Sequence, residues 1–230
     1  FVNSQKKFAD EMLDRKVFES SEISLQKLFK ETRYFITGTN LLASDKSSEA
    51  LLFLVEYASK SGVSIVIDAN WREIFWDKLD KSSQIQKQDH IQKIKKFLLN
   101  GDILKLSNEE AILFFGNNNP LLISQSLSKK PDVIITNGDK PISWFINGFQ
   151  DTTKVLKSPR IVDTTGAGDS FLAGLISRFI NRKEDFDKDS LINHIQFASV
   201  CGLISCLGEG AIQPQPNINQ VQDFLESYGS

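Results

Sequence analysis

The sequence predicts an α/β fold with a largely parallel sheet that helices cover on both faces. Short apolar stretches such as residues 63–68 alternate with stretches whose apolar residues recur at helical spacing, such as residues 47–59. Polar clusters follow several predicted strands, as expected where parallel strands end at one edge of a sheet. No repeat, low-complexity tract or linker interrupts the pattern, so we expect one domain over residues 1–230.

Helices and strands are predicted in regular alternation through the first half. Apolar residues spaced for one face predict a helix at residues 22–30. A broader apolar face predicts another at residues 47–59, followed by Gly62 at the position after the helix end that favours glycine. The other predicted elements are strands at 34–38, 63–68, 103–106 and 133–136, and helices at 85–99, 109–115 and 121–127.

The second half is predicted to hold a hairpin, one more strand and three helices. Residues 143–146 are expected to pair with residues 154–156 across a loop longer than a tight turn. Residues 159–162 are predicted to form a strand. The helices are predicted at 171–180, 190–206 and 219–227.

Residues 163–171, Asp-Thr-Thr-Gly-Ala-Gly-Asp-Ser-Phe, place a glycine-rich turn between a predicted strand and a predicted helix. Such a turn favours an anion, because the first N–H groups of a helix lack internal partners. Asp169 falls in the first helical turn, where the helix dipole favours negative charge. On spacing alone, a capped helix after a glycine turn is an equally good interpretation. Phe171 replaces the third glycine of a dinucleotide fingerprint, and no Walker A Gly-Lys-Ser/Thr follows.

The composition is typical of a globular protein without a polyanion partner. Lys and Arg number 27 against 29 Asp and Glu, a net charge of −2, so no basic surplus predicts nucleic-acid binding. The apolar runs are too short to span a bilayer. Cys201 and Cys206 are five residues apart on one predicted helix and face different directions, which argues against a disulfide. We therefore expect a cytoplasmic protein without membrane or nucleic-acid partners.

Three further polar loops follow predicted strands, at residues 68–72, 107–110 and 136–140. Their convergence on one sheet edge would make a binding site. Ser107 and Glu110 also have the spacing of a capping box, in which each side chain bonds the other residue's backbone N–H.

Arg72 is the strongest candidate for contacting a substrate in the first of these loops. Its guanidinium is a rigid fork that suits a phosphate or a carboxylate group. The alternative is a structural salt bridge to Asp68 or Glu73.

Residues 163–171 resemble, nearly residue for residue, the C-terminal signature of the PfkB (ribokinase-like) carbohydrate kinases, D-T-T-G-A-G-D-x-F. The resemblance implies a ribokinase-like three-layer α/β/α fold with a mostly parallel central sheet. It implies that Asp169 is the catalytic base and that Gly166, Ala167 and Gly168 form an anion hole. It also implies ATP and Mg²⁺ as cofactors and, in ribokinase-like members, K⁺.

Other segments extend the resemblance. Residues 68–76 resemble the D-x-N-x-R-x-x-L/F-W segment of fructokinases and 2-keto-3-deoxygluconate kinases, which implies substrate binding by Asp68, Asn70, Arg72 and Asp169. Glu110 matches a Glu that organises Mg²⁺ through water. The resemblance implies nucleotide binding by Ser107, Thr136, Gly138, Lys140, Gly168, Ser199 and Gly202, and monovalent-cation binding by Asp163, Thr165, Ser205, Gly208 and Gly210.

Three residues depart from the family pattern. Ser107 stands where the family has Asn, Ser199 stands where it often has Asn, and Pro141 replaces the second glycine of the T-x-G-x-x-G nucleotide loop. Pro141 removes one backbone donor from that loop. These departures weaken the predicted contacts to ATP.

The favoured function is a fructokinase that transfers the γ-phosphoryl group of ATP to a primary sugar hydroxyl. The alternatives are a kinase for 2-keto-3-deoxygluconate, ribose or a nucleoside, and a non-catalytic regulatory subunit. The resemblance covers residues 33–224 and lacks the family's N-terminal third, so residues 1–8 are expected to be the tail of a β lid that is otherwise absent. The chain alone is expected to be inactive, and family members commonly form homodimers through that lid.

Overall fold

The computed structural model describes residues 13–76, 84–158, 160–180 and 187–228. Its internal contacts divide the chain into two compact units. The first extends to Asn118 and includes Leu122–Val133, and the second comprises Asn119–Leu121 and the chain from Ile134 onward.

The first unit is built on three parallel strands. These are β1 (Tyr34–Gly38), β2 (Ser64–Asp68) and β3 (Ile103–Ser107), in register with Gly38 opposite Asp68 and Val66 opposite Ile103. Strands β2 and β3 are buried along most of their length, as expected when helices cover both faces of a sheet. The unit's helices are α1 (Arg15–Ser20), α2 (Glu22–Glu31), η2 (Asn40–Ala43), α3 (Asp45–Lys60), α4 (Glu73–Trp76), α5 (Gln84–Leu98), α6 (Asn108–Phe115) and most of α7 (Pro120–Ser126).

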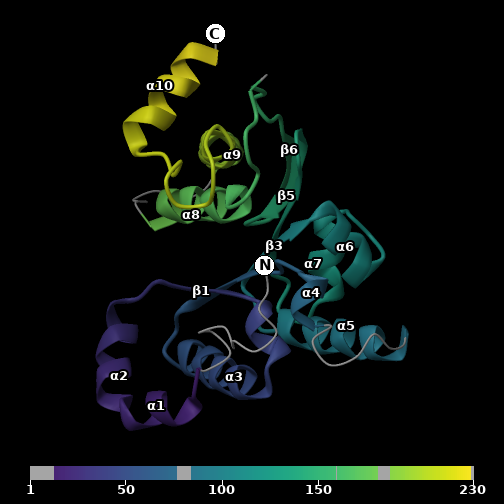
Figure 1. The fold of residues 1–230 in the computed structure, drawn as a ribbon, viewed down its shortest axis with the longest axis vertical. Helices are drawn as coiled ribbons and strands as arrows, with labels where there is room; N and C mark the ends of the chain where they lie inside the picture. The colour runs from purple at the N-terminus through teal and green to yellow at the C-terminus, as the bar shows by residue number, and fades with distance from the viewer. Residues whose placement is uncertain (1–12, 77–83, 159, 181–186, 229–230) are drawn as a thin grey trace. The chain divides into compact units, whose positions relative to one another are not determined.

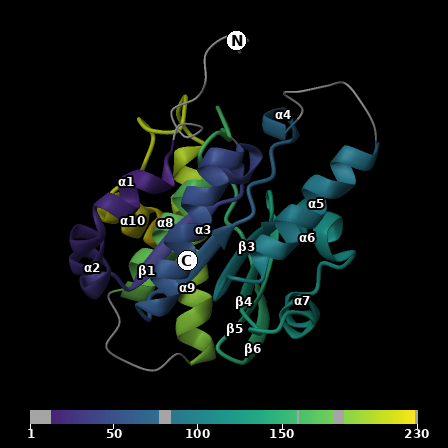
Figure 2. The same cartoon turned by 90° about the horizontal axis from the view of Figure 1, so that it is seen from below.

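Helix α3 packs across β2 and has α1 beside it (Figure 2). It buries Leu51, Val55 and Ala58, which recur at the spacing of one helical face. Gly62 follows the helix with a φ of 72°, a left-handed conformation that glycine adopts without a Cβ clash. The predicted end of this helix is confirmed.

The second unit contains a tight antiparallel hairpin. Strand β4 (Asp132–Asn137) starts in the first unit and continues into the second, where β5 (Lys140–Ile146) pairs with β6 (Phe149–Thr153). Asn147 and Gly148 connect β5 to β6 with φ values of 50° and 82°, as a two-residue type I′ turn requires. The predicted pairing with residues 154–156 was wrong, because the Asn-Gly turn closes the hairpin earlier.

Three helices complete the second unit. They are α8 (Ala167–Ile180), α9 (Lys188–Ser205) and α10 (Ile218–Tyr228). Helix α9, seen end-on in Figure 1, packs against α8, α10 and β6. The contact with α8 is close: a Cβ on Gly174 would lie 2.7 Å from Cys201 Sγ and 3.2 Å from Ala198 Cα. The buried Ser170 hydroxyl donates to the Cys201 carbonyl at 3.0 Å.

The strand predicted at residues 159–162 was wrong. Residues 160–162 form no strand, and residue 159 lies outside the described residues. The N–H groups of Val162 and Asp163 instead donate to the carbonyl of Cys206, at 2.8 and 3.3 Å. Ile161 and Val162 are about half exposed, whereas a central strand would bury them.

The remaining predicted helices and strands are present within a few residues of their expected bounds. The short elements α1, η2 and α4 were not predicted. Parallel strands with flanking helices confirm the α/β class. The lid tail predicted at residues 1–8 lies outside the described residues, and the single-domain assignment stays a prediction. Among the described helices, none has the length and apolarity to cross a membrane.

We expect Gly174→Ala to destabilise the protein. The added methyl group would overlap Cys201, and overpacking of this kind costs about 1–3 kcal/mol, against a gain of about 1 kcal/mol in helix propensity. Urea unfolding measures the change. The loss should shrink in a Cys201→Ala background, and an equal loss in both backgrounds would contradict the packing explanation. Ala173→Ser, on the exposed face of the same helix, is the control.

Candidate functional site

The turn before α8 is braced by the carboxylate of Asp163. Its Oδ1 accepts the backbone N–H and the hydroxyl of Thr165, at 2.9 and 2.7 Å. Its Oδ2 accepts the N–H of Gly210 at 3.0 Å. These hydrogen bonds, the Thr165 hydroxyl first, hold the pKa of Asp163 below its ordinary value. One carboxylate therefore ties residues 163–165 to the loop around Gly210.

Gly166 lies where the loop around Gly210 comes close to the turn before α8. Its φ is 81°, and a Cβ here would lie 2.9 Å from Ala211 Cβ and 3.0 Å from Ala211 Cα. Both the left-handed backbone and the close approach require glycine. The structure thus brings together Asp163, Thr165 and Gly210, three of the five residues predicted to bind a monovalent cation.

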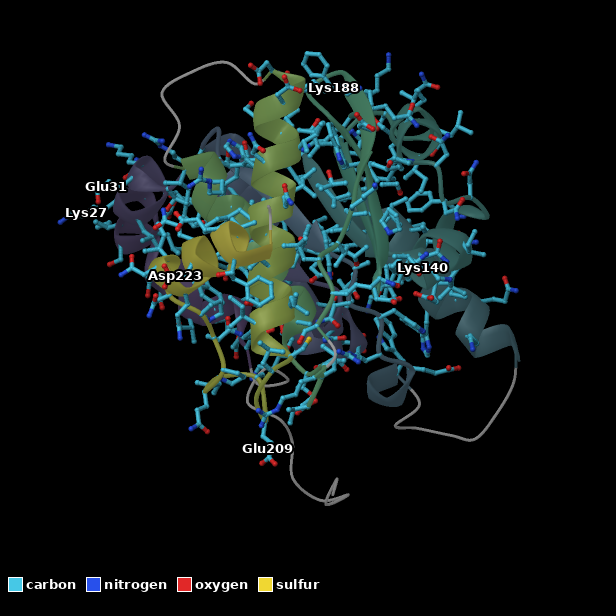
Figure 3. The ribbon with its side chains drawn as sticks, turned by 90° about the horizontal axis from the view of Figure 1, so that it is seen from above. Lys27, Glu31, Lys140, Lys188, Glu209 and Asp223 are labelled. Carbon is cyan, nitrogen blue, oxygen red and sulfur yellow. The ribbon has the colours of Figure 1, made fainter. Side chains whose placement is uncertain are left out.

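The other two of those five residues lie near the end of α9. The Ser205 hydroxyl donates to the Gly202 carbonyl at 2.8 Å, and Gly208 packs against Pro214. The loop continues to Glu209, whose side chain points away from the ribbon in Figure 3.

Asp169 lies in the first turn of α8 and is exposed. The N–H of Ala167 donates to the Thr164 carbonyl at 3.2 Å, so this predicted oxyanion donor is already used in the turn. Ser170 makes the first helical bond, to the carbonyl of Gly166 at 2.8 Å. The helix itself therefore supplies no carbonyl for the N–H groups of Gly168 and Asp169, which are the donors suited to an anion.

A cavity of about 530 Å³ opens beside this helix start, entirely within the second unit. This volume lies within the range of small-molecule sites. Its walls come from the β4–β5 turn, residues 155–158, the start of α8 and one side of α9. The lining residues are Thr136, Gly138, Asp139, Ile142, Val155, Leu156, Lys157, Ser158, Ile161, Thr164, Ala167, Gly168, Phe171, Ser199, Gly202, Leu203 and Cys206.

Five of the seven predicted nucleotide-binding residues line this cavity: Thr136, Gly138, Gly168, Ser199 and Gly202. Lys140 is not among the lining residues and is exposed at the start of β5 (Figure 3). Ser107 belongs to the first unit. The Ser199 hydroxyl donates to the Gln196 carbonyl at 2.8 Å. Gly202 has a packing role as well, because a Cβ there would lie 3.0 Å from the Ala167 carbonyl oxygen.

The sequence analysis missed one charged residue of the cavity wall, Lys157. Lys157 Nζ lies 2.8 Å from Asp139 Oδ2, and this exposed ion pair joins the β4–β5 turn to residues 155–158. The hydrogen bond from Lys157 lowers the pKa of Asp139. No motif marks Lys157, because it lies in an irregular segment.

Cys206, which also lines the cavity, is buried and free, as is Cys201. Burial raises the pKa of both thiols, that of Cys201 to about 11.

The remaining predicted residues lie in the first unit, at the carboxyl ends of β2 and β3. Asp68 is buried, and its two carboxylate oxygens lie 3.1 and 3.0 Å from Nζ of the buried Lys105. Asn70 has a φ of 37°, and its Oδ1 accepts the Nε–H of Arg72 at 3.2 Å. Glu73, proposed as one partner of Arg72, pairs with Lys87 at 2.5 Å.

The capping box at the start of α6 is confirmed. Glu110 N–H donates to Ser107 Oγ at 3.1 Å, and Ser107 N–H donates to Glu110 Oε2 at 2.7 Å. In addition, Glu110 Oε1 accepts the N–H of Trp71 at 2.6 Å. The Glu110 carboxylate, which is 9% exposed, therefore joins the loop after β2 to the loop after β3.

Comparison with known proteins places this geometry in a family. The sequence model of the pfkB family carbohydrate kinases matches residues 8–218, which is most of the chain. The chain belongs to the PfkB family. The predicted resemblance is therefore confirmed.

The curated relatives include fructokinases. The chain is 26% identical over 214 residues to a protein named Probable fructokinase-6, chloroplastic, from Arabidopsis thaliana, covering 91% of this chain and 53% of that protein. It is 26% identical over 205 residues to Fructokinase-1 of Oryza sativa subsp. japonica, covering 87% and 61%. The chain thus spans about half to three-fifths of the length of these relatives. Its cytoplasmic location stays a prediction.

Solved structures confirm the ribokinase-like fold of this PfkB chain. The fructokinase of Xylella fastidiosa with bound ATP superposes with a TM-score of 0.81 at 18% identity, covering 98% of this chain and 69% of that chain. The fructokinase of Vibrio cholerae O395 with fructose, ADP and calcium superposes with a TM-score of 0.71 at 22% identity, covering 84% and 60%.

We expect the Asp163 brace to weaken in acid. Its folded-state pKa lies below the ordinary value of 3.8, so its contribution is present above that value and is lost as pH falls through the lower, folded-state pKa. Hydrogen exchange of the Gly210 amide, compared with its intrinsic rate, should lose protection as the pH falls below the ordinary Asp value of 3.8.

In Asp163→Asn, protection of the Gly210 amide should be low already at neutral pH and should not follow this titration. Asp139→Asn, which removes another exposed carboxylate of the same unit, is the control. Unchanged Gly210 protection in Asp163→Asn would show that the brace does not hold the loop.

Proposed function

We propose that this protein is an ATP-dependent sugar kinase that transfers the γ-phosphoryl group of ATP to a primary sugar hydroxyl, with fructose as the favoured acceptor. The observation that carries the proposal is the position of Asp169. It is exposed in the first turn of α8, and the two preceding residues, Ala167 and Gly168, line the cavity. A proton acceptor thus adjoins a helix N-terminus and a nucleotide-sized hollow.

The cavity suits the nucleotide. The surface of its wall is mostly apolar and also carries polar groups, a combination that is typical of small-molecule sites. Thr164, Ala167 and Gly168 bring the start of α8 into this wall, where the unpaired helical N–H groups and the dipole favour phosphate oxygens. Thr136 and Gly138, from β4 and the turn after it, and Gly202, from α9, would also contact the nucleotide.

Asp169 would act as the general base. It would accept the proton of the sugar hydroxyl while the hydroxyl oxygen forms a bond to the γ-phosphorus and the bond from that phosphorus to the β-phosphate oxygen breaks. The N–H groups of Gly168 and Asp169 would stabilise charge on the transferred phosphoryl oxygens. Gly166 would contribute by permitting the turn that presents them.

Mg²⁺ fits this chain as an ion held chiefly by phosphates and water. Within the described ranges, no group of three His, Cys, Asp or Glu residues could hold a metal ion. Glu110 uses one lone pair of each carboxylate oxygen on backbone N–H groups, which leaves acceptor capacity for a bound water. The ion would neutralise part of the negative charge on the phosphates. A monovalent cation would be bound near Asp163, Thr165 and Gly210, where two loops meet.

Fructose is favoured by residues 68–72 together with the named relatives. Asn70 and Arg72 follow β2 and carry the amide and guanidinium that recognise sugar hydroxyls or a phosphoryl group. The other acceptors consistent with this site are 2-keto-3-deoxygluconate, ribose and adenosine.

The test is ADP release from Mg-ATP, with K⁺ present, by the full-length protein across fructose, 2-keto-3-deoxygluconate, ribose and adenosine. We expect turnover with fructose. Asp169→Asn should lower kcat by about 10²–10⁴-fold while ATP binding is retained, because only proton acceptance is removed.

Asp189→Asn is the matched control, since Asp189 is an exposed acid in the first turn of α9. Its kcat should equal that of the wild type. Turnover with another sugar would overturn the fructose assignment alone. ATP binding without turnover on any acceptor would favour the non-catalytic subunit.

A further inference from the structure

Lys105 and Asp68 form an ion pair deep in the first unit. Their side chains are 9% and 8% exposed, and Nζ lies 3.0 and 3.1 Å from the two carboxylate oxygens. The pair lies where β2 ends beside β3, with Asp68 opposite Lys105 in the parallel register. The sequence analysis named Asp68 but not Lys105.

Such a pair is a poor source of stability. Removing two charges from water costs several kcal/mol per ion, and the attraction between the ions offsets this only when the geometry is good. The Lys129–Asp102 pair of the same unit differs, with a separation of 2.8 Å and side chains 36% and 40% exposed. A buried pair at the carboxyl end of the strands therefore suggests a role other than stability.

The residues after Asp68 are held at each successive peptide. The N–H of Ala69 donates to the Lys105 carbonyl at 3.0 Å, and the Ala69 carbonyl accepts the buried Thr39 hydroxyl. The N–H of Trp71 donates to Glu110. Between these anchors Asn70 adopts a left-handed φ of 37°, which costs free energy in a non-glycine residue and needs surrounding contacts to maintain it.

We propose that Lys105 is a positioning residue for the sugar, acting through Asp68. Its ammonium fixes the Asp68 carboxylate at the end of β2, and this fixes the backbone that turns through Asn70 toward Arg72. Asp68 then serves as an anchor of this segment rather than as a contact to the sugar. The inference rests on the proposed sugar-kinase function for its kinetic test, whereas its structural test is independent of activity.

The competing explanation is that the pair only fills space in the core. The two explanations differ for a double variant without charge, Asp68→Asn with Lys105→Met. A pair that only fills space can be replaced by uncharged side chains of similar volume with little loss. A pair that orients the Asn70 turn cannot be replaced in this way, because the double variant lacks the ionic contact that fixes the turn.

The kinetic test compares Lys105→Met, the double variant and wild type, all in the full-length protein with ATP and fructose. We expect kcat/KM for fructose to fall about 10–100-fold in both variants, because small misplacements of a binding residue have effects of this size. KM for ATP should stay unchanged, since the cavity residues lie in the second unit. Lys129→Met, which breaks the exposed pair, is the control and should match wild type.

Hydrogen exchange provides the readout that needs no turnover. The amides of Ala69 and Trp71 should exchange at least about tenfold faster in both variants. The Val63 amide, which precedes β2 and donates to the Ala58 carbonyl, should stay protected. Lys105→Met leaves the buried Asp68 carboxylate without its ammonium partner and could therefore fail to fold. In that event the double variant, which has no buried charge at this pair, still gives the measurement.

Wild-type exchange at Ala69 and Trp71 in the double variant, or wild-type kcat/KM for fructose in it, would overturn the proposal. Failure of the wild type to phosphorylate any sugar would instead count against the proposed function. The exchange rates would then decide alone whether Lys105 holds the segment.

Discussion

The close approach of α8 and α9 is the constraint on which the candidate nucleotide site depends. Gly174 brings α8 against Cys201 and Ala198, and Gly202 brings α9 against the carbonyl of Ala167. Because neither contact has room for a Cβ, the start of α8 is fixed against the side of α9. This contact sets one wall of the cavity and the place of Asp169.

Each unit uses a carboxylate to hold its functional loops. Asp163 accepts N–H groups from its own turn and from the Gly210 loop, and Glu110 accepts N–H groups from the loops after β2 and β3. A carboxylate can satisfy several donors at once, and bonds to a charged acceptor are stronger than neutral ones. Asp163 and Glu110 therefore each join two chain segments that no pairing of strands holds together at these residues.

The regular elements could be predicted from periodicity, since burial on one or both faces leaves a clear apolar pattern. The hairpin was misplaced because the Asn147-Gly148 turn was overlooked, although this dipeptide is a strong hairpin signal. The strand expected at 159–162 failed for another reason. The apolar residues Ile161 and Val162 suggested a strand, but their segment forms hydrogen bonds to the end of α9 instead of to a sheet.

The sequence by itself determined the family, predicted the glycine turn before α8 and indicated the capping box at Ser107 and Glu110, which the structure confirmed. These are local patterns in which a few neighbouring residues fix the backbone. Tertiary structure alone decided that Lys105 meets Asp68 and that Lys157 meets Asp139. The partners in these pairs are 37 and 18 residues apart, and no local periodicity records such a distance. Only the pairing of strands and the course of the loops brings those charges together.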